Sequence, residues 1–487
     1  MTRWFVDRSA RRGIPTVSLR RLLPGARFHG GPDLEVSRCT DDSRRLEPGQ
    51  VFVAVQGPRR DGHDFVGHAL ERGAAGVVVE RYCPEAGRPQ VVVADSRRAL
   101  TRLCLALAGA EAETLPLIGL TGTRGKTATG LFLRSILEAS GARVGRIGPT
   151  IPGAEDLAGM LGALVDRGCA AALIELGDDA LRRRRLDGLA FAAAIVARLR
   201  EGLDAEPEAL RQQRRSRAAR VVRAVSAGGE VVINADDPDA ELLGAVNLEA
   251  RRVSFGIDAP ADVSARIDRL DAAGSRIRLR GFDREVTVAL RPIGARHVTC
   301  ALAAAALAWA RGLPTDAVVA GLEAVACVPG QLEAVGAGTP CDVRVDRTRT
   351  EADLRQALQT LRETGAARIW CVLGSEGHHD PALRRGLARA AEAGADQVIL
   401  TTDSPRAEDP DQILDDLLGG FRRPGRVQVE PDRRRAIETA LALAGPGDVV
   451  LIVGDGRQTD SLLADRALPR NDSAIAAAWL PGQRRSA

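Results

Sequence analysis

Short apolar runs alternate with longer, partly polar segments along most of the chain. Buried strands are predicted where Val, Ile, Leu and Ala gather, at 51–55, 75–79, 91–93, 115–120, 171–174, 192–196 and 230–234. Segment 65–72 predicts a helix, and Leu131, Leu133, Ile136 and Leu137 recur at helical spacing after the run 115–120. This alternation favours an α/β fold with a mostly parallel sheet covered by helices.

The pattern changes between 253 and 290, where apolar and polar residues alternate in 275–279 and 285–290. Such alternation predicts an antiparallel excursion with one solvated face. An Ala-rich segment at 297–311 then predicts a buried helix. After a break at 328–330, a third α/β unit is predicted, with a helix at 433–444 and strands at 342–345, 369–373, 397–400, 427–429 and 449–453.

Length and composition add a domain count. The 487 residues exceed what one hydrophobic core serves and suggest three domains, which we place at 1–112, 113–330 and 331–487. Pro116 and the pair Pro329 and Gly330 mark the linkers. With 45% hydrophobic, 27% charged and only 3% aromatic residues, the chain is globular, and its cores rest on aliphatic side chains.

Charge and apolar content exclude several classes of partner. A net charge of +4 gives no signal for nucleic acid, and no run of about 18 apolar residues predicts membrane insertion. The start of the chain lacks the apolar stretch of a signal peptide, so we expect a cytoplasmic protein, and we expect a monomer. The eight scattered cysteines include no CxxC pair and predict buried free thiols, in preference to zinc ligands or disulfides.

The candidate chemistry begins directly after the run 115–120. Strand, glycine-rich turn and helix start follow one another through Gly122, Thr123, Arg124, Gly125, Lys126 and Thr127. This order predicts a P-loop, in which backbone N–H groups cradle phosphate, Lys126 neutralises charge and Thr127 binds Mg²⁺. Lys126 is the only lysine in the chain. Because Leu120 occupies the first glycine position of the full pattern, an ordinary glycine-rich turn is the alternative.

Several motifs in order over three domains resemble the Mur ligases, most closely the MurE type. They are Asp42-Ser43-Arg44, Asp61-Gly62-His63-Asp64-Phe65, the loop from Gly122 to Thr127, Asn234-Ala235-Asp236-Asp237-Pro238 and Asp403-Ser404-Pro405-Arg406. The resemblance implies a three-domain Mur ligase architecture. An N-terminal UDP-substrate domain would precede a central P-loop ATP-binding domain and a C-terminal Rossmann-like domain for the incoming amino acid.

The resemblance also implies an activity. A carboxylate of a UDP-muramoyl peptide would attack the γ-phosphate of ATP, and the amine of an amino acid such as diaminopimelate would displace phosphate from the acyl-phosphate. Mg²⁺ would neutralise the phosphates.

The family's functional positions can be matched to single residues. Lys126 and Glu175 would be catalytic, with Glu175 and Thr127 as metal ligands. Asp236, His297 and Asp346 would join the loop in binding the nucleotide, and Ser43, Asp403 and Arg406 would bind the substrates. Structural alternatives stay open: a strand-end acid for Glu175, a turn aspartate for Asp236 and a solvated arginine for Arg406. His378, His379 and Asp380 predict a polar surface loop in preference to a metal site.

Other positions depart from the family. Gly202 stands where a histidine binds a second metal, and the window 211–217 holds no lysine where the family carbamylates one, near Ser216. The segment 454–458 also differs from the family's amino-acid pocket. Two hypotheses follow: a working ligase of MurE type, and a catalytically impaired MurE-like paralogue that binds nucleotide in a regulatory or scaffolding role.

Overall fold

The computed structural model describes residues 16–482, apart from 58–59, 88, 110–111, 113, 149, 152, 201–206, 337–340, 455–459, 464–465 and 470. The chain separates into two compact units. The first comprises 1–200, 206–264 and 302–321, and the second comprises 201–205, 265–301 and 322–487. The division into three domains at 112 and 330 stays a prediction.

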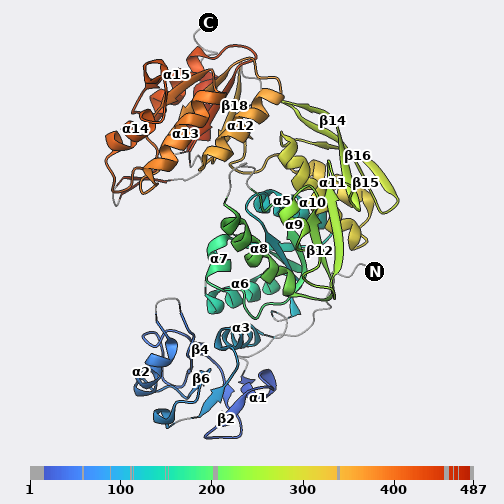
Figure 1. The fold of residues 1–487 in the computed structure, drawn as a ribbon, viewed down its shortest axis with the longest axis vertical. Coiled ribbons are helices and arrows are strands. Elements are labelled where there is room, and N and C mark those ends of the chain that lie inside the picture. The colour runs from blue at the N-terminus through green and yellow to red at the C-terminus, as the bar shows by residue number, and fades with distance from the viewer. Residues whose placement is uncertain are drawn as a thin grey trace. The chain divides into compact units, whose positions relative to one another are not determined.

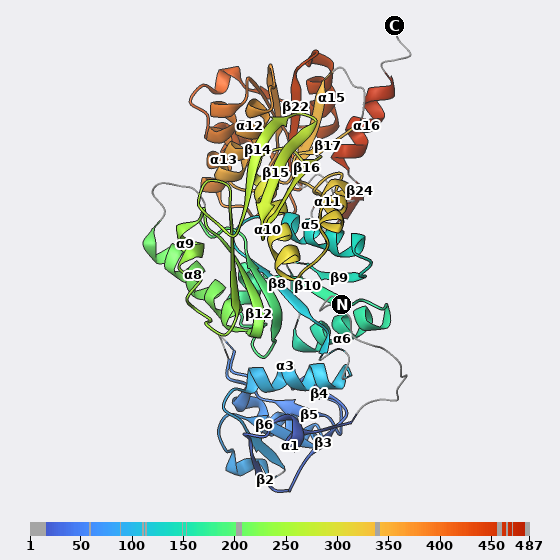
Figure 2. The same cartoon turned by 90° about the vertical axis from the view of Figure 1, so that its right-hand side faces the viewer.

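The N-terminal part of the first unit is the small α/β element that the sequence predicts. Its sheet has the order β2-β7-β6-β5-β4 and is parallel except where β2 meets β7. The strands are β2 (Arg27–His29), β4 (Cys39–Thr40), β5 (Val51–Val53), β6 (Gly76–Val79) and β7 (Gln90–Val92). A 3₁₀ turn leads into α2 (Val66–Glu71), and α3 (Ser96–Leu107) contacts α6 (Ala154–Asp166), as Figure 2 shows.

A nine-stranded sheet follows, with the order β16-β15-β14-β13-β12-β11-β8-β10-β9. Every pairing described from β9 to β14 is parallel, and β15 and β16 are antiparallel, which confirms the predicted excursion. The strands are β8 (Leu117–Thr121), β9 (Val144–Ile147), β10 (Ala171–Glu175), β11 (Phe191–Val196), β12 (Val225–Asn234), β13 (Arg251–Gly256), β14 (Val263–Asp271), β15 (Gly274–Gly281) and β16 (Arg284–Leu290).

Helices cover both faces of the parallel part of this sheet. Successive side chains of a strand point to opposite faces, and β8 shows this at two neighbouring positions. A Cβ on Gly119 would lie 3.2 Å from Val221 of α8 (Glu208–Arg223), whereas Leu120 faces Gly130 of α5 (Lys126–Ala139). The predicted Ala-rich helix is α10 (Ala295–Ala310), and α11 (Thr315–Ala324) follows it.

The second unit contains a six-stranded sheet of order β17-β18-β22-β19-β20-β21, parallel except for β17 (Glu333–Ala334). The other strands lie within one residue of their predicted positions: β18 (Asp342–Asp346), β19 (Ile369–Leu373), β20 (Gln397–Leu400), β21 (Gln428–Val429) and β22 (Val449–Val453).

Alternate residues of β22 divide the core around this sheet into two layers. Leu451 and Val453 pack with α12 (Glu351–Glu363), α13 (Pro381–Gly394) and α14 (Pro410–Leu418), which lie side by side in Figure 1. Val450 and Ile452 pack on the opposite face with α15 (Arg433–Leu443) and α16 (Asp472–Gly482). The α/β fold is therefore confirmed in both units.

The cysteines are free and mostly buried, as the sequence predicts. All eight cysteines are free thiols; seven are buried, and Cys327 is half-buried, so the prediction is wrong only in the burial of Cys327.

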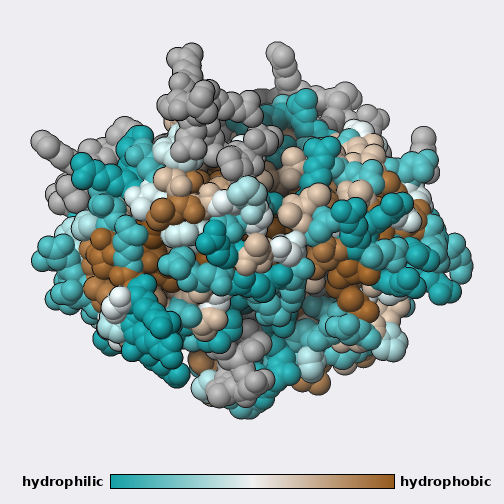
Figure 3. Space-filling view, turned by 90° about the horizontal axis from the view of Figure 1, so that it is seen from above, coloured by the Kyte–Doolittle hydropathy of each residue, from teal (hydrophilic) through white to brown (hydrophobic). Residues whose placement is uncertain are grey.

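Across the described residues, no helix is long and apolar enough to cross a lipid bilayer. Figure 3 shows a face on which hydrophilic residues surround separate hydrophobic patches, as is usual for a globular protein.

Candidate nucleotide and amino-acid sites

The predicted phosphate loop lies between the end of β8 and the start of α5. Gly122 and Gly125 have φ of +131° and +86°, in the region that favours glycine. A Cβ on Gly122 would lie 2.6 Å from the carbonyl oxygen of Arg198. Both glycines therefore serve backbone conformation, and Gly122 also allows close packing. Helix α5 presents its N-terminus at Lys126, as a P-loop requires.

Lys126 is half-buried and turns its ammonium group toward its own loop. Its Nζ donates hydrogen bonds to the carbonyl oxygens of Gly122 and Thr123. Burial lowers the pKa of Lys126, and the nearby carboxylates of Glu175 and Asp178 oppose this shift. A cation held at the start of a helix, partly removed from water, is suited to an anionic ligand such as a phosphate.

Glu175 reaches the same loop from the end of β10. The side chain of Glu175 is buried, and its Oε2 accepts a hydrogen bond of 2.7 Å from the Thr127 hydroxyl. Arg146 Nε lies 3.5 Å from Oε1, which accepts no hydrogen bond within the described part of the chain. The structure therefore brings the two predicted metal ligands, Thr127 and Glu175, together.

These residues fit a magnesium–nucleotide ligand. Mg²⁺ at phosphate sites takes one or two protein oxygens and completes its octahedron with phosphate oxygens and water. Thr127 and Glu175 supply such a pair, and no described residue donates a hydrogen bond to the buried Oε1 of Glu175. No group of three or more His, Cys, Asp and Glu side chains among the described residues is arranged to hold a metal without such outside oxygens.

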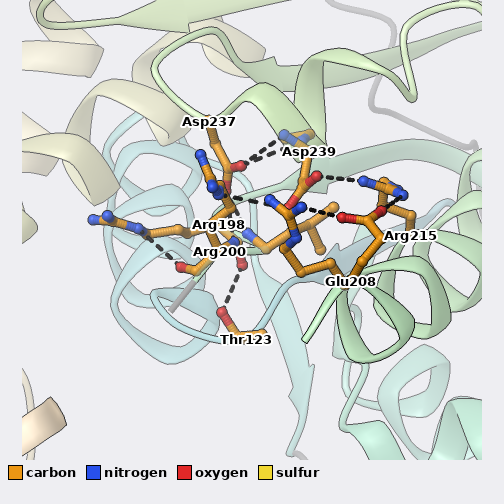
Figure 4. Close-up of polar contacts among 10 residues, drawn as sticks. Thr123, Arg198, Arg200, Glu208, Arg215, Asp237 and Asp239 are labelled. Atoms are coloured by element: carbon orange, nitrogen blue, oxygen red, sulfur yellow. Dashed lines mark hydrogen bonds and ion pairs between the residues drawn. The ribbon is translucent and has the colours of Figure 1, made fainter. Parts of the chain in front are cut away.

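A second loop holds the phosphate loop in place, as Figure 4 shows. Thr123 donates from its backbone N and its hydroxyl to the Arg198 carbonyl, at 2.6 and 3.0 Å. The buried carboxylate of Asp237 accepts from the backbone N of Leu199 at 2.6 Å and of Arg200 at 3.0 Å. Asp237 was missed by sequence reasoning, although it follows a buried strand in a turn that the chain presents as Asp-Asp-Pro.

Arginine and acidic side chains pair beside this loop. Asp239 lies 2.6 Å from Arg215 Nη1 and 3.7 Å from Arg200 Nε, and Arg215 also pairs with Glu208 at 2.5 Å (Figure 4). Arg215 belongs to the lysine-free window 211–217, which lies on α8, where Ser216 is exposed. Gly202 lies outside the described residues.

The carboxylate of Asp236 accepts hydrogen bonds from the backbone of a different segment, 257–259. Its two carboxylate oxygens accept from the backbone N of Ile257, Asp258 and Ala259, at 2.7 to 3.0 Å. This arrangement fits the structural alternative for Asp236. A role in nucleotide binding stays a prediction.

Three further residues that were predicted to bind nucleotide or substrate are buried: Ser43, His297 and Asp346. In the first unit, the Ser43 hydroxyl lies 3.1 Å from His68 Nδ1. In the second unit, His297 Nδ1 lies 2.6 Å from the carbonyl of Ile293, and burial lowers the pKa of His297 to about 4. Asp346 accepts from the Thr348 hydroxyl and the Leu332 backbone N. Burial raises the pKa of Asp346. Their ligand contacts stay predictions.

Asp403 lines a pocket at the carboxyl ends of β18, β19, β20 and β22, and Arg406 contacts one of the residues that line it. Its lining includes Asp403, Thr348, Arg349, Ser375, Glu376 and His379. Arg406 Nη2 lies 3.1 Å from Glu376 Oε2, so the arginine is ion-paired within the protein instead of simply solvated. The predicted surface loop 378–380 is partly corrected, because His379 is half-buried and lies 3.3 Å from the Ser375 hydroxyl. Residues 455–458 lie outside the described part.

Known proteins resemble the chain along almost its whole length. Profiles described as Mur ligase family, catalytic domain, as Mur ligase middle domain and as Mur ligase, glutamate ligase domain match residues 35–106, 120–308 and 331–456. A protein named UDP-N-acetylmuramoyl-L-alanyl-D-glutamate–2,6-diaminopimelate ligase from Geobacillus kaustophilus (strain HTA426) is 32% identical over 482 residues, or 95% of this chain and 98% of the relative.

Two further comparisons agree. A protein of the same name from Chlorobium phaeobacteroides (strain DSM 266 / SMG 266 / 2430) is 35% identical over 473 residues, or 90% of this chain and 91% of the relative. A solved structure of a ligase of that name has a TM-score of 0.71 at 25% identity and covers 96% of this chain and 100% of its own. Because family profiles match three successive segments of the chain, and relatives more than 30% identical cover nine-tenths of it or more, the chain belongs to the Mur ligase family and is of the MurE type.

Proposed function

We propose that this chain is an ATP-dependent amide ligase of peptidoglycan precursor synthesis, which joins an amino acid to UDP-N-acetylmuramoyl-L-alanyl-D-glutamate. The observation that carries the proposal is the grouping of Lys126, Thr127 and Glu175 at one phosphate loop, in a chain that matches ligases of this name over nine-tenths of its length or more. Diaminopimelate, the amino acid in the relatives' names, is the amino acid that we assign.

The chain's own residues have distinct tasks in this reaction. MgATP, when bound, supplies the phosphoryl group that turns a substrate carboxylate into an acyl-phosphate. Lys126 would compensate phosphate charge from the start of α5, and Thr127 and Glu175 would hold Mg²⁺. The backbone N–H groups around Gly122 and Gly125 would orient the phosphates. Positioning and charge compensation are the main needs of phosphoryl transfer, and none of these tasks requires a protein nucleophile.

The compartment and the assembly state belong to the same proposal. Eight free thiols suit a reducing compartment, which supports the cytoplasm as the place of the reaction. We also keep the monomer as a prediction, to be measured by sedimentation.

The impaired-paralogue hypothesis has less support. The relatives compared above are all named as ligases, and the contact between Glu175 and Thr127 keeps a metal-binding pair beside the loop. The sequence features that support it are the departures from the family at Gly202 and in the window 211–217. A turnover measurement distinguishes the two hypotheses.

The test is release of ADP from MgATP with UDP-muramoyl dipeptide, in the presence and absence of diaminopimelate. We expect ADP release that requires both substrates in the wild type and falls at least about 100-fold in Lys126→Ala, because the loop loses its cation. Arg134→Ala is the matched control, since it removes an exposed positive charge from the same helix. Isothermal titration with MgATP should show weaker binding to Lys126→Ala.

Two outcomes would contradict the proposal. Absence of substrate-dependent ADP release by the wild type, with MgATP still bound, would favour the impaired paralogue. Equal MgATP affinity of the wild type and Lys126→Ala would remove the phosphate loop from the site.

A further inference from the structure

Arg198 follows strand β11 directly beside the phosphate loop. In the nine-stranded sheet, β8 lies between β11 and β10, so the loop after β8 has one neighbouring strand on each side. Glu175 ends β10 and pairs with Leu120 of β8. Val196 ends β11 and pairs with Thr121 of β8. The chain therefore leaves β11 on the side of the loop opposite to Glu175, and Arg198 is the second residue after that strand.

The backbone of Arg198 is fixed by the phosphate loop and by its own neighbours. A Cβ on Gly122 would lie 2.6 Å from the carbonyl oxygen of Arg198 and 3.0 Å from its backbone N, so the two segments are in close contact. Leu199 is buried, and its backbone N donates to Asp237 at 2.6 Å. Ala197, on the other side, is also buried. Arg198 therefore has a defined place beside the loop.

The side chain of Arg198 is exposed, whereas those of the residues on either side are buried. Its Nε donates to the Arg200 carbonyl at 3.1 Å, and Figure 4 shows the side chain extending away from Asp239 and Arg215. In the described part of the chain, no carboxylate pairs with Arg198, and no group accepts from its Nη atoms. Arg200 and Arg215, by contrast, pair with Asp239 at 3.7 and 2.6 Å. Of these three arginines, Arg198 alone brings a charge that no described carboxylate compensates.

A guanidinium held in this way suits a phosphate oxygen. Arginine presents a planar fork of N–H groups that matches phosphate geometry, and it stays charged throughout the physiological pH range. Because Nε is bonded to the Arg200 carbonyl, part of the side-chain entropy is lost before a ligand arrives. The Nη groups remain for that ligand. Thr127 and Glu175 would hold Mg²⁺ on the β10 side of the loop, and Arg198 would add a positive charge on the β11 side.

We propose that Arg198 contacts the terminal phosphate of the bound nucleotide and compensates the charge of the phosphoryl group while it is transferred. This inference rests on the proposed ligase function and adds a phosphate-contacting residue to its first site. Charge on the oxygens of the transferred group is the main thing that a protein can stabilise in phosphoryl transfer. Arg198 would neither form a covalent bond nor move a proton, because its guanidinium stays protonated.

Nucleotide binding tests this contact without catalysis. Isothermal titration compares MgADP with the Mg²⁺ complex of adenylyl imidodiphosphate, a triphosphate analogue that is not transferred. We expect Arg198→Gln to bind the analogue about tenfold more weakly than the wild type, because a charge-assisted contact is lost. MgADP lacks the terminal phosphate, so its affinity should stay within about twofold of the wild-type value. An intact MgADP affinity also shows that the phosphate loop keeps its structure.

Matched variants separate this contact from general effects of charge. Arg200→Gln removes a cation two residues away that already pairs with Asp239, and it should weaken binding of the analogue less than about threefold. Arg223→Gln removes an exposed cation of α8 and should bind both nucleotides as the wild type does. Arg198→Lys keeps the charge but loses the planar fork, so it should bind the analogue about threefold more weakly.

Turnover supplies a second readout. In ADP release with UDP-muramoyl dipeptide and diaminopimelate, we expect kcat of Arg198→Gln to fall about 100-fold, since charge compensation matters most during transfer. The KM for diaminopimelate should stay near the wild-type value, because the proposed contact is with the nucleotide.

The inference and the proposed function fail in different ways. An unchanged affinity of folded Arg198→Gln for the analogue overturns the contact, and an equal loss for MgADP overturns it too, because the loop itself would then be disturbed. Thermal unfolding shows whether Arg198→Gln is folded. If it is not, Arg198→Lys decides, and a wild-type affinity and kcat in that variant overturn the inference. Absence of substrate-dependent ADP release by the wild type, with the difference in analogue affinity present, overturns the ligase function and leaves the phosphate contact.

Discussion

The phosphate loop and the pocket of the second unit lie in similar places but are held by different interactions. Both follow the carboxyl ends of parallel strands. The phosphate loop rests on a backbone carbonyl, that of Arg198, and the backbone beyond it rests on the buried carboxylate of Asp237. The pocket loops rest on the buried guanidinium of Arg384 and on the acids Glu408 and Asp416.

This difference matches the ligands that the two sites would take. A phosphate group is recognised by many backbone N–H groups, so the first site needs an exact main-chain path and few charged side chains. An amino-acid side chain is recognised by a small number of charges, so the second site needs those charges fixed and mutually compensated. The predictions below disturb each type of anchor in turn.

Removal of the Asp237 carboxylate should have the largest effect. Four backbone N–H groups, those of Leu199, Arg200, Asp239 and Ala240, lose their acceptor in Asp237→Ala. We expect a loss of about 3 kcal/mol in the free energy of unfolding, because buried donors without partners are costly. Since Arg198 would lose its support, MgATP affinity should also fall, by about tenfold.

Asp236→Ala is the matched control for Asp237→Ala. Asp236 also accepts three backbone hydrogen bonds, but from Ile257, Asp258 and Ala259, away from the Arg198 segment. Urea unfolding and isothermal titration should show lower stability in both variants and weaker MgATP binding only in Asp237→Ala. A larger loss of MgATP affinity in Asp236→Ala would instead assign Asp236 to the nucleotide, as the family resemblance implies.

The phosphate loop shows how much a local pattern can predict. Strand, turn and helix there are consecutive, so the residues from Gly122 to Thr127 reveal the geometry without knowledge of the fold. Glu175 was predicted from the family resemblance, and the apolar run before it indicated that it ends a strand. The strands of the second unit were predicted almost to the residue for the same reason, because short runs such as that of β19 are apolar throughout.

Asp237 and Glu376 show what the sequence could not reveal. Their roles depend on partners 37 or 38 and 30 residues away, and no local periodicity reports which acid faces which backbone or guanidinium. Asp236 and Asp237 are adjacent and chemically identical, and only the path of the chain after β12 and β13 separates their tasks. The burial of Arg384 was equally hidden, because an arginine on an amphipathic helix normally faces water.

Substitution of Glu175 tests the charge that the phosphate loop does require from a side chain. Glu175→Gln keeps the acceptor for the Thr127 hydroxyl and removes the negative charge. We expect the Mg²⁺ concentration for half-maximal ADP release to rise about 10-fold to 100-fold. Asp179→Asn, at an exposed acid of α7 (Asp178–Arg182), is the control of equal charge change. An unchanged Mg²⁺ requirement in Glu175→Gln would leave Glu175 as the structural acid of the alternative interpretation.

The smallest effect is expected when the pH is lowered, which weakens the ion pair between Arg384 and Glu408. The hydrogen bonds from Arg384 are the main cause that lowers the pKa of Glu408 from 4.5 to about 2, with burial opposing them. A carboxylate whose folded-state pKa is lowered contributes stability above its unfolded-state pKa and loses it as the pH falls from about 4.5 toward 2. Because the Glu408 side chain is 28% exposed, we expect only about 1 kcal/mol from this source. The free energies of unfolding of the wild type and Glu408→Gln, measured with urea, should therefore differ most at neutral pH and converge near pH 2.5.

The control is Asp179→Asn, which removes an acid from a surface ion pair. Its free energy of unfolding should stay close to that of the wild type at every pH. A gap between the wild type and Glu408→Gln that stayed constant on acidification would mean that packing, and not the charge of Glu408, holds the pocket loops together.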